Sequence, residues 1–166
     1  MLIHGIHQAL NEESVTQMHR LGDRVEFANG SETAAFVYVQ FDVAATLITD
    51  IFRYDTYINK LVDQTTDASN MIAGLLCLSA VNTTQYFGWL QYWGAKLTQL
   101  DGTTALSNNL LGDGSVASGE ALMPHASTNG MVDTFAGAVN IDMGVALEDD
   151  APAITLYCLM CRASAV

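Results

Sequence analysis

The apolar residues of this chain come in short runs separated by glycine, asparagine and aspartate, a pattern typical of β-strands joined by tight turns. Two such runs, Leu21–Phe27 and Ala34–Phe41, flank Asn29-Gly30, a dipeptide that favours the turn of a β-hairpin. The second run contains Phe36-Val-Tyr-Val-Gln-Phe41, which is β-branched or aromatic on both faces, as in a strand that is covered on both sides. We therefore expect a hairpin early in the chain, with its second strand covered on both sides.

The middle of the chain contains an internal repeat. Shifted by 70 residues without a gap, residues 59–74 (NKLVDQTTDASNMIAG) lie over residues 129–144 (NGMVDTFAGAVNIDMG), and six of the sixteen positions are identical. These positions are Asn59/Asn129, Val62/Val132, Asp63/Asp133, Ala68/Ala138, Asn70/Asn140 and Gly74/Gly144. A fixed period indicates one supersecondary unit used twice, although two similar turns between strands would also produce it. We expect the copies at about residues 45–93 and 115–162.

The repeat bears on an ambiguous segment. Residues 43–62 alone have apolar residues at helical spacing, with Asp42 as an available N-cap. The matching segment 113–132 contains three glycines and Pro124. Glycine costs a helix roughly 1 kcal/mol and an interior proline roughly 3 kcal/mol. We therefore predict strands for both segments.

The fold class expected is all-β, a sandwich or barrel of short strands with an internal two-fold repeat and an N-terminal arm. Residues 1–20 form the arm, in which an amphipathic helix over Gln8–Met18 is an alternative, and residues 21–166 form a single β domain. The arm either reaches a neighbouring subunit or frays. In the second copy, strands are expected within residues 120–123, 130–132, 142–147 and 153–161.

An aromatic segment, residues 85–94 (QYFGWLQYWG), ends the first copy. Strand alternation places Phe87, Trp89, Gln91 and Trp93 on one face, and Tyr86, Gly88, Leu90 and Tyr92 on the other. Because aromatic side chains bury roughly 150–250 Å² each, we expect a core strand. A contact strand or sugar-binding platform is the alternative. The candidate site residues are Tyr86, Phe87, Trp89, Tyr92 and Trp93.

The composition limits the partners of the protein. Six basic residues against eighteen acidic ones give a net charge of −12, which disfavours direct contact with nucleic acid. Half of the residues are apolar and only 14% are charged, so we expect surface buried against copies of the chain or against a partner. The sequence shows no signal peptide, and its longest apolar-rich run, residues 71–81, is too short to span a bilayer.

The motifs that could carry chemistry are weak. Cys158 and Cys161 lack the second pair that a four-ligand zinc site requires, and His4 and His7 lack further ligands nearby. The segment Gly112–Ala117 matches the residue spacing of a dinucleotide-binding fingerprint. We discard it, because it neither follows an expected strand nor opens an expected helix. Glu148-Asp149-Asp150 either contributes oxygens to a calcium site or forms a solvated acidic turn. We expect no cofactor, no metal and no enzyme activity.

Several of these segments together resemble a known group of proteins. They are Gly119-Glu-Ala-Leu-Met-Pro124, Thr128-Asn-Gly-Met-Val-Asp133, Asp142-Met-Gly-Val-Ala-Leu-Glu-Asp149 and the closing run Ile154–Met160, with His19-Arg-Leu-Gly-Asp-Arg-Val25, Phe36-Val-Tyr-Val39 and Gln85-Tyr-Phe-Gly-Trp-Leu-Gln91 earlier in the chain. Over residues 18–162 this order of segments resembles that of head decoration (cement) and related virion structural proteins of tailed bacteriophages.

The resemblance implies a function in the virion. Such a protein is a β-rich subunit, often a homotrimer, that is made in the host cytoplasm, docks on the lattice of the major capsid protein and reinforces it. A tail, neck or fibre structural protein is a second expectation. A small-ligand or sugar-binding β-barrel that uses Trp89 and Trp93 is a third, from another functional class.

Overall fold

A computed structural model describes residues 10, 12–29, 32–42, 51–56, 60–63, 72–76, 86–95, 118–119, 121–124, 132–134, 144–146 and 158–160. These residues form strands, turns and extended segments, without a helix. The strands are β1 (Arg24–Asn29), β2 (Glu32–Phe41), β3 (Ile51–Thr56), β4 (Leu61–Asp63), β5 (Ile72–Leu76), β6 (Phe87–Ala95), β7 (Ala121–Pro124), β8 (Val132–Thr134), β9 (Gly144–Ala146) and β10 (Cys158–Met160). The prediction of an all-β protein is confirmed.

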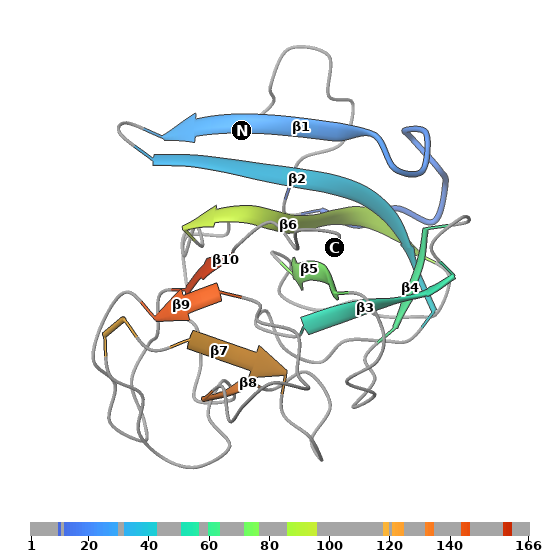
Figure 1. Ribbon diagram of the computed structural model, residues 1–166. Coiled ribbons are helices and arrows are strands. Elements are labelled where there is room, and N and C mark those ends of the chain that lie inside the picture. Colours follow the sequence, from blue (N-terminus) through green and yellow to red (C-terminus); the bar gives the residue numbers. More distant parts are fainter. Residues whose placement is uncertain are drawn as a thin grey trace.

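Five of the strands close into a β-barrel (Figure 1). Around the barrel, β2 pairs with β4 in parallel, and β4–β3, β3–β5, β5–β6 and β6–β2 are antiparallel pairs. Because the ring is closed, each of the five strands pairs with a neighbouring strand on both of its edges. Of the two forms that the sequence left open, the barrel is the one that these strands adopt.

The predicted hairpin is confirmed as the pair β1–β2. Its register runs from Arg24 opposite Val37 to Asn29 opposite Glu32, which leaves Gly30 and Ser31 between the strands. The turn therefore lies one residue later than the Asn29-Gly30 pair suggested. The strands predicted for residues 43–62 are confirmed at 51–56 and 61–63, whereas residues 43–50 lie outside the described part of the chain.

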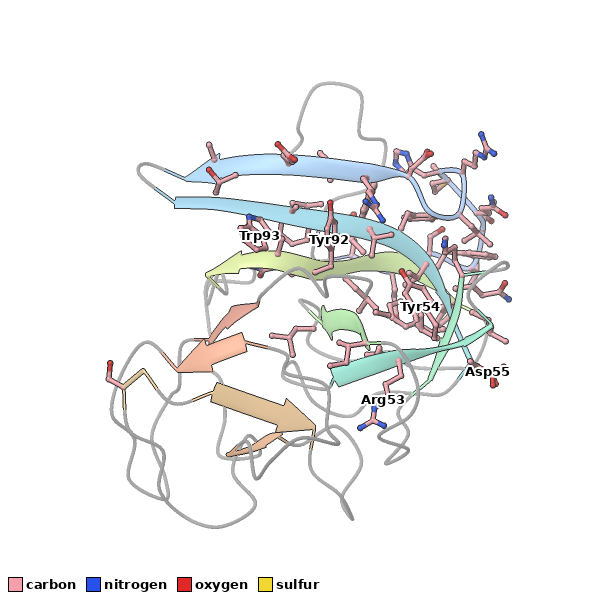
Figure 2. All side chains as sticks on the ribbon, viewed as in Figure 1. Arg53, Tyr54, Asp55, Tyr92 and Trp93 are labelled. Carbon is pink, nitrogen blue, oxygen red and sulfur yellow. The ribbon has the colours of Figure 1, made fainter. Side chains whose placement is uncertain are left out.

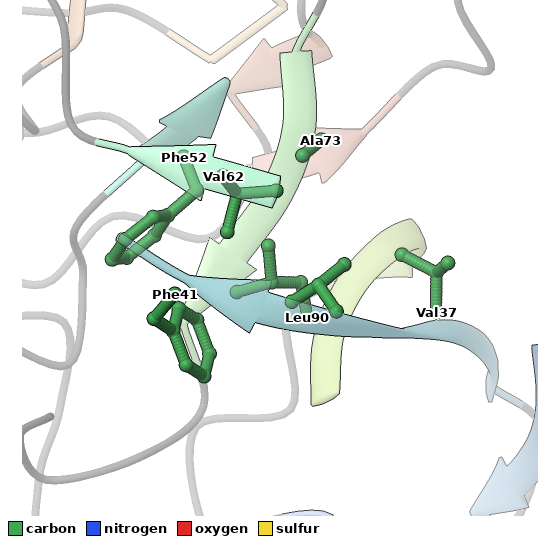
Figure 3. Packing of buried hydrophobic residues seen from close by; sticks show 7 residues of the cluster. Val37, Phe41, Phe52, Val62, Ala73 and Leu90 are labelled. Carbon is green, nitrogen blue, oxygen red and sulfur yellow. The ribbon is translucent and has the colours of Figure 1, made fainter. Parts of the chain in front are cut away.

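Side chains fill the barrel. One cluster of buried residues takes members from all five barrel strands and converges on the barrel axis (Figure 3). Its members are Val37, Val39, Phe41, Phe52, Val62, Ala73 and Leu90. Phe41 and Phe52 meet edge to face with ring centroids 5.2 Å apart, a preferred aromatic geometry. A five-stranded barrel packed in this way holds a core and leaves its outer surface for contacts with other molecules.

A second buried cluster covers the outer face of β2 and β6. It contains Leu10, Ala34, Phe36, Tyr38 and Trp89, with Leu21, Val25 and Phe87 packed against it. Thus β2 is buried on both faces, as its sequence predicts: Phe36 and Tyr38 point outward, and Val37, Val39 and Phe41 point inward.

The N-terminal segment supplies the cover for that outer face. Ser14 and Phe87 exchange two backbone hydrogen bonds of 2.9 Å, and the Leu10 side chain is buried. The alternative helix over Gln8–Met18 is wrong for residues 12–18, which are extended and bent, because Ser14 bonds to β6 instead of to its own turn. The described part of the arm therefore lies on its own chain.

Candidate functional site

The aromatic strand β6 divides its side chains between the two clusters. Phe87 and Trp89 pack in the outer cluster, whereas Leu90 lies inside the barrel, with Tyr86 and Tyr92 packed against the inner cluster. This division follows from the alternation of side chains along a strand. The assignment of faces predicted for residues 86–91 is confirmed, and β6 is a core strand over that stretch.

Trp89 belongs to a ring cluster that is closed to ligands. Its indole is 2% exposed and meets Tyr38 edge to face, with centroids 5.0 Å apart. His19 covers both rings at centroid distances of 5.1 Å, and Phe87 stacks on Tyr38. No sugar can stack on Trp89 while this cluster is intact, so one of the two rings proposed for a sugar platform is in the core.

Tyr38 ties the N-terminal segment to the barrel. Its phenol oxygen accepts a hydrogen bond of 3.1 Å from the Met18 backbone N–H. Burial raises the pKa of the Tyr38 phenol above the ordinary value of 10.0, and the hydrogen bonds with the Met18 and His19 backbone oppose that rise. This hydroxyl is a structural group held in its neutral form.

A β-bulge changes the direction of the last aromatic residues of β6. Gln91 lies opposite Phe36, but Trp93 lies opposite Ala35, so Tyr92 is an extra residue in the pair β2–β6. Ala35 is on the same face as Val37, and Tyr92 packs against the inner cluster. Tyr92 and Trp93 therefore share one face, and the prediction from simple alternation, which put them on opposite faces, is wrong. Figure 2 shows the two side by side along β6.

Two neighbouring residues hold the bulge in place. The buried Gln91 side chain donates from Nε2 to the carbonyl oxygens of Trp93, at 3.2 Å, and Gly94, at 3.4 Å. Gly94 has a φ of 91°, and a Cβ there would stand 2.1 Å from the Thr33 carbonyl oxygen. The chain thus uses a buried amide and a glycine to fix how Trp93 is presented.

Charged groups flank these aromatic rings. The Arg24 guanidinium carbon lies 5.1 Å from the centroid of the Tyr92 ring, a cation–π contact. Glu26 lies opposite Ala35, which in turn lies opposite Trp93, so the three form one row across β1, β2 and β6. Arg24 and Glu26 are both exposed, and Trp93 is 36% exposed. We call Arg24, Glu26, Tyr92 and Trp93 the Trp93 face.

A buried cation lies elsewhere on the barrel. Arg53 of β3 is 1% exposed and lies opposite Asp63 of β4. Figure 2 shows Arg53 projecting from the other side of β3 than Tyr54. Nothing in the sequence singles out Arg53, because residues 53 and 63 become neighbours only through the register of β3 and β4.

The weak chemical motifs lie mostly outside the described residues. This holds for His4, His7, Gly112–Ala117, Cys161 and Glu148–Asp150, whereas Cys158 opens β10. Among the residues that the structure describes, no three His, Cys, Asp or Glu side chains gather as a metal site would require. No helix in that part of the chain is long and apolar enough to cross a membrane.

Comparison with protein families, with curated proteins and with solved structures finds no match to this chain.

Proposed function

We propose that this chain is a structural, non-enzymatic protein of a tailed-phage virion that binds the assembled capsid and stabilises it. The observation that carries the proposal is the filled five-stranded barrel: its interior holds Phe41, Phe52 and Leu90, while Trp93 of β6 stays exposed. A protein built in this way acts through its surface. The resemblance to decoration proteins over residues 18–162 supplies the partner, the lattice of the major capsid protein.

The mechanism is linkage between binding and assembly. A subunit that binds the assembled shell, and not its free components, stabilises the shell by a free energy that rises with the logarithm of its concentration relative to its Kd. The net charge of −12 keeps the protein off the packaged genome and limits contacts between virions. Self-association adds contacts in parallel, because linked subunits bind a lattice with higher avidity than single ones.

We also propose that the chain contains two copies of one four-stranded unit, arranged in tandem. The strand order β4-β3-β5-β6 matches β8-β7-β9-β10. Phe52 opposite Gly74 corresponds, 70 residues on, to Leu122 opposite Gly144, and Arg53 opposite Asp63 corresponds to Met123 opposite Asp133. Equal strand order and equal register support a duplicated unit over a chance likeness of turns.

The two proposed units join edge to edge. Strand β6 of the first unit pairs antiparallel with its counterpart β10 in the second, through Ala95 opposite Leu159 and Gly94 opposite Met160. An antiparallel pair of equivalent strands is what a local two-fold axis produces. The last pair departs from the 70-residue rule, since Leu75 lies opposite Gln91 but Val145 lies opposite Leu159, two residues earlier than expected.

Binding to heads tests the function directly. Purified protein is mixed with heads that lack it, and the heads are sedimented and then heated. We expect the protein to sediment with the heads in a saturable manner and to raise the temperature at which they open. Protein that stays in the supernatant contradicts the proposal, and protein that sediments only with tails or fibres favours the second expectation.

A further inference from the structure

The Trp93 face is an exposed aromatic surface at one end of the barrel. Trp93 is one of three large apolar side chains exposed in the described part of the chain, with Val15 and Met18. Two charged groups lie on the same face of the sheet: Arg24 lies over the neighbouring Tyr92 ring, and Glu26 occupies the same row as Trp93 across the strands. Neighbouring strands lie roughly 5 Å apart, so Glu26 and Trp93 are about 10 Å apart along this row.

The backbone that carries the Trp93 face is ordered by contacts within the chain. The bulge at Tyr92 turns two consecutive aromatic residues to one side of the sheet, and Gln91 and Gly94 fix the backbone that carries them. Bulges commonly re-aim side chains at functional positions. A surface whose groups are already ordered loses less conformational entropy on binding, which favours affinity.

We propose that the Trp93 face is the contact between two copies of this chain related by a two-fold axis. Trp, Tyr and Arg are the residue types that most often dominate protein interfaces. A two-fold contact uses the same patch on both copies, so the patch must complement itself. This one does, because it carries one guanidinium and one carboxylate beside its aromatic pair, and rotation brings Arg24 of one copy toward Glu26 of the other.

The charge of the chain favours this occupant over others. Copies with a net charge of −12 repel one another least where a local cation and anion cancel, and Arg24 and Glu26 provide such a place. A polyanionic ligand would be repelled by the rest of the chain. An extended peptide that added a strand would pair with the edge of β1, two strands away from Trp93. The proposal rests on the self-association in the proposed function, but not on capsid binding.

Light scattering and sedimentation equilibrium over a range of protein concentrations test the interface. The wild-type chain should form a dimer of the 17.8 kDa subunit. Trp93→Ala should raise the dimer Kd by roughly tenfold or more, as for interface residues of this type. Arg24→Glu and Glu26→Arg should each weaken the dimer, because like charges then meet, whereas the double variant Arg24→Glu/Glu26→Arg should restore it.

Matched controls separate the face from general effects. Arg20→Glu makes the same charge reversal at an exposed arginine outside the face, and Met18→Ala removes an exposed apolar side chain there; neither should change the Kd. Near-ultraviolet circular dichroism checks that each variant keeps the buried Trp89 environment. If Trp93→Ala fails to fold, the charge exchange decides the matter by itself.

Three results would overturn the proposal. They are a wild-type chain that stays monomeric at every concentration, a dimer or trimer that Trp93→Ala leaves intact, and a double charge exchange that fails to restore the dimer. A monomer whose tryptophan fluorescence changes saturably with cellohexaose, and no longer does so in Trp93→Phe, would make the face a glycan site instead. Because no heads are used, failure here is distinct from failure of capsid binding.

Discussion

Gly94 passes so close to Thr33 that a Cβ on Gly94 would lie 2.1 Å from the Thr33 carbonyl oxygen. This approach lets β6 continue past its bulge toward the pairing with β10 while Trp93 points to the Trp93 face. A single missing side chain therefore permits both the presentation of the aromatic pair and the junction of the two proposed units.

Gly94→Ala should destabilise the protein by more than backbone strain alone. An alanine with a positive φ costs about 1–2 kcal/mol, and the collision with Thr33 adds about 1–3 kcal/mol of overpacking. Gly119→Ala is the matched control, since Gly119 has nearly the same φ but nothing within 4 Å of its ideal Cβ. Urea unfolding of both variants measures the difference, and equal losses would show that the close approach is absent.

Trp89→Ala should lower the free energy of unfolding by about 3–5 kcal/mol, because it removes the largest ring of the outer cluster. Trp93→Ala on the same strand should cost about 1 kcal/mol or less, as for a surface position. Urea denaturation followed by circular dichroism compares the two. If Trp89→Ala keeps the stability of the wild type, Trp89 is not a core residue.

Because of Tyr38, the free energy of unfolding should fall at alkaline pH. Its pKa is higher in the folded than in the unfolded chain, so the folded state holds the phenol proton more tightly. The contribution of this group is fully present below pH 10 and is lost as the pH rises through the folded-state pKa. Tyr38→Phe should lose about 1 kcal/mol at pH 7 through the missing hydrogen bond to Met18. Above pH 10, the free energy of unfolding of Tyr38→Phe should fall less steeply than that of the wild type.

The measurement is the free energy of unfolding in urea between pH 8 and pH 11.5 for both chains. Tyr86→Phe serves as the control, because it removes the phenol of the residue just before β6 while leaving Tyr38 in place. Parallel curves for the wild type and Tyr38→Phe through the alkaline range would show that Tyr38 is not buried as described.

The duplicated unit predicts which cysteine pairs can form a disulfide in the second half. Met123 and Asp133 are directly opposite each other, so Met123→Cys/Asp133→Cys should oxidise, in a chain whose Cys77, Cys158 and Cys161 are replaced by serine. A disulfide needs Cα atoms about 4.4–6.8 Å apart and side chains on one face. Met123→Cys/Thr134→Cys is the control, since Thr134 lies opposite Leu122 and is one residue out of register with Met123. Mass spectrometry measures disulfide formation in both variants. Oxidation of the control pair would disprove the register.

The sequence predicted the parts of the fold that depend on local pattern. The run Phe36–Phe41, apolar on both faces, is a strand buried on both faces. Strands were expected within residues 120–123, 130–132, 142–147 and 153–161; β9 and β10 lie within those bounds, β7 ends one residue later, and β8 overlaps them only at Val132. The β1–β2 hairpin followed from turn chemistry, although its turn lies one residue later because the strand register runs on to Asn29 and Glu32.

The features that the sequence did not predict depend on contacts between distant segments. Nothing in the segment of residues 85–94 indicates a bulge, because the bulge needs the Gln91 amide to reach two carbonyls and Thr33 to approach Gly94. In the same way, Leu10 and Ser14 gave a helical pattern, which their packing on β2 and β6 overrides. The candidate aromatic residues were thus found from the sequence, but not which of them reach solvent.

Cryo-electron microscopy of the virion that carries this protein would show directly whether it binds the head. We expect density for the five-stranded barrel at repeated positions on the outer surface of the head, in contact with the major capsid protein. In a head that lacks the protein, that density should be absent and the lattice otherwise unchanged. A virion whose head carries no such density, with the protein in the tail or missing from the particle, would show that the protein is not a capsid-binding protein.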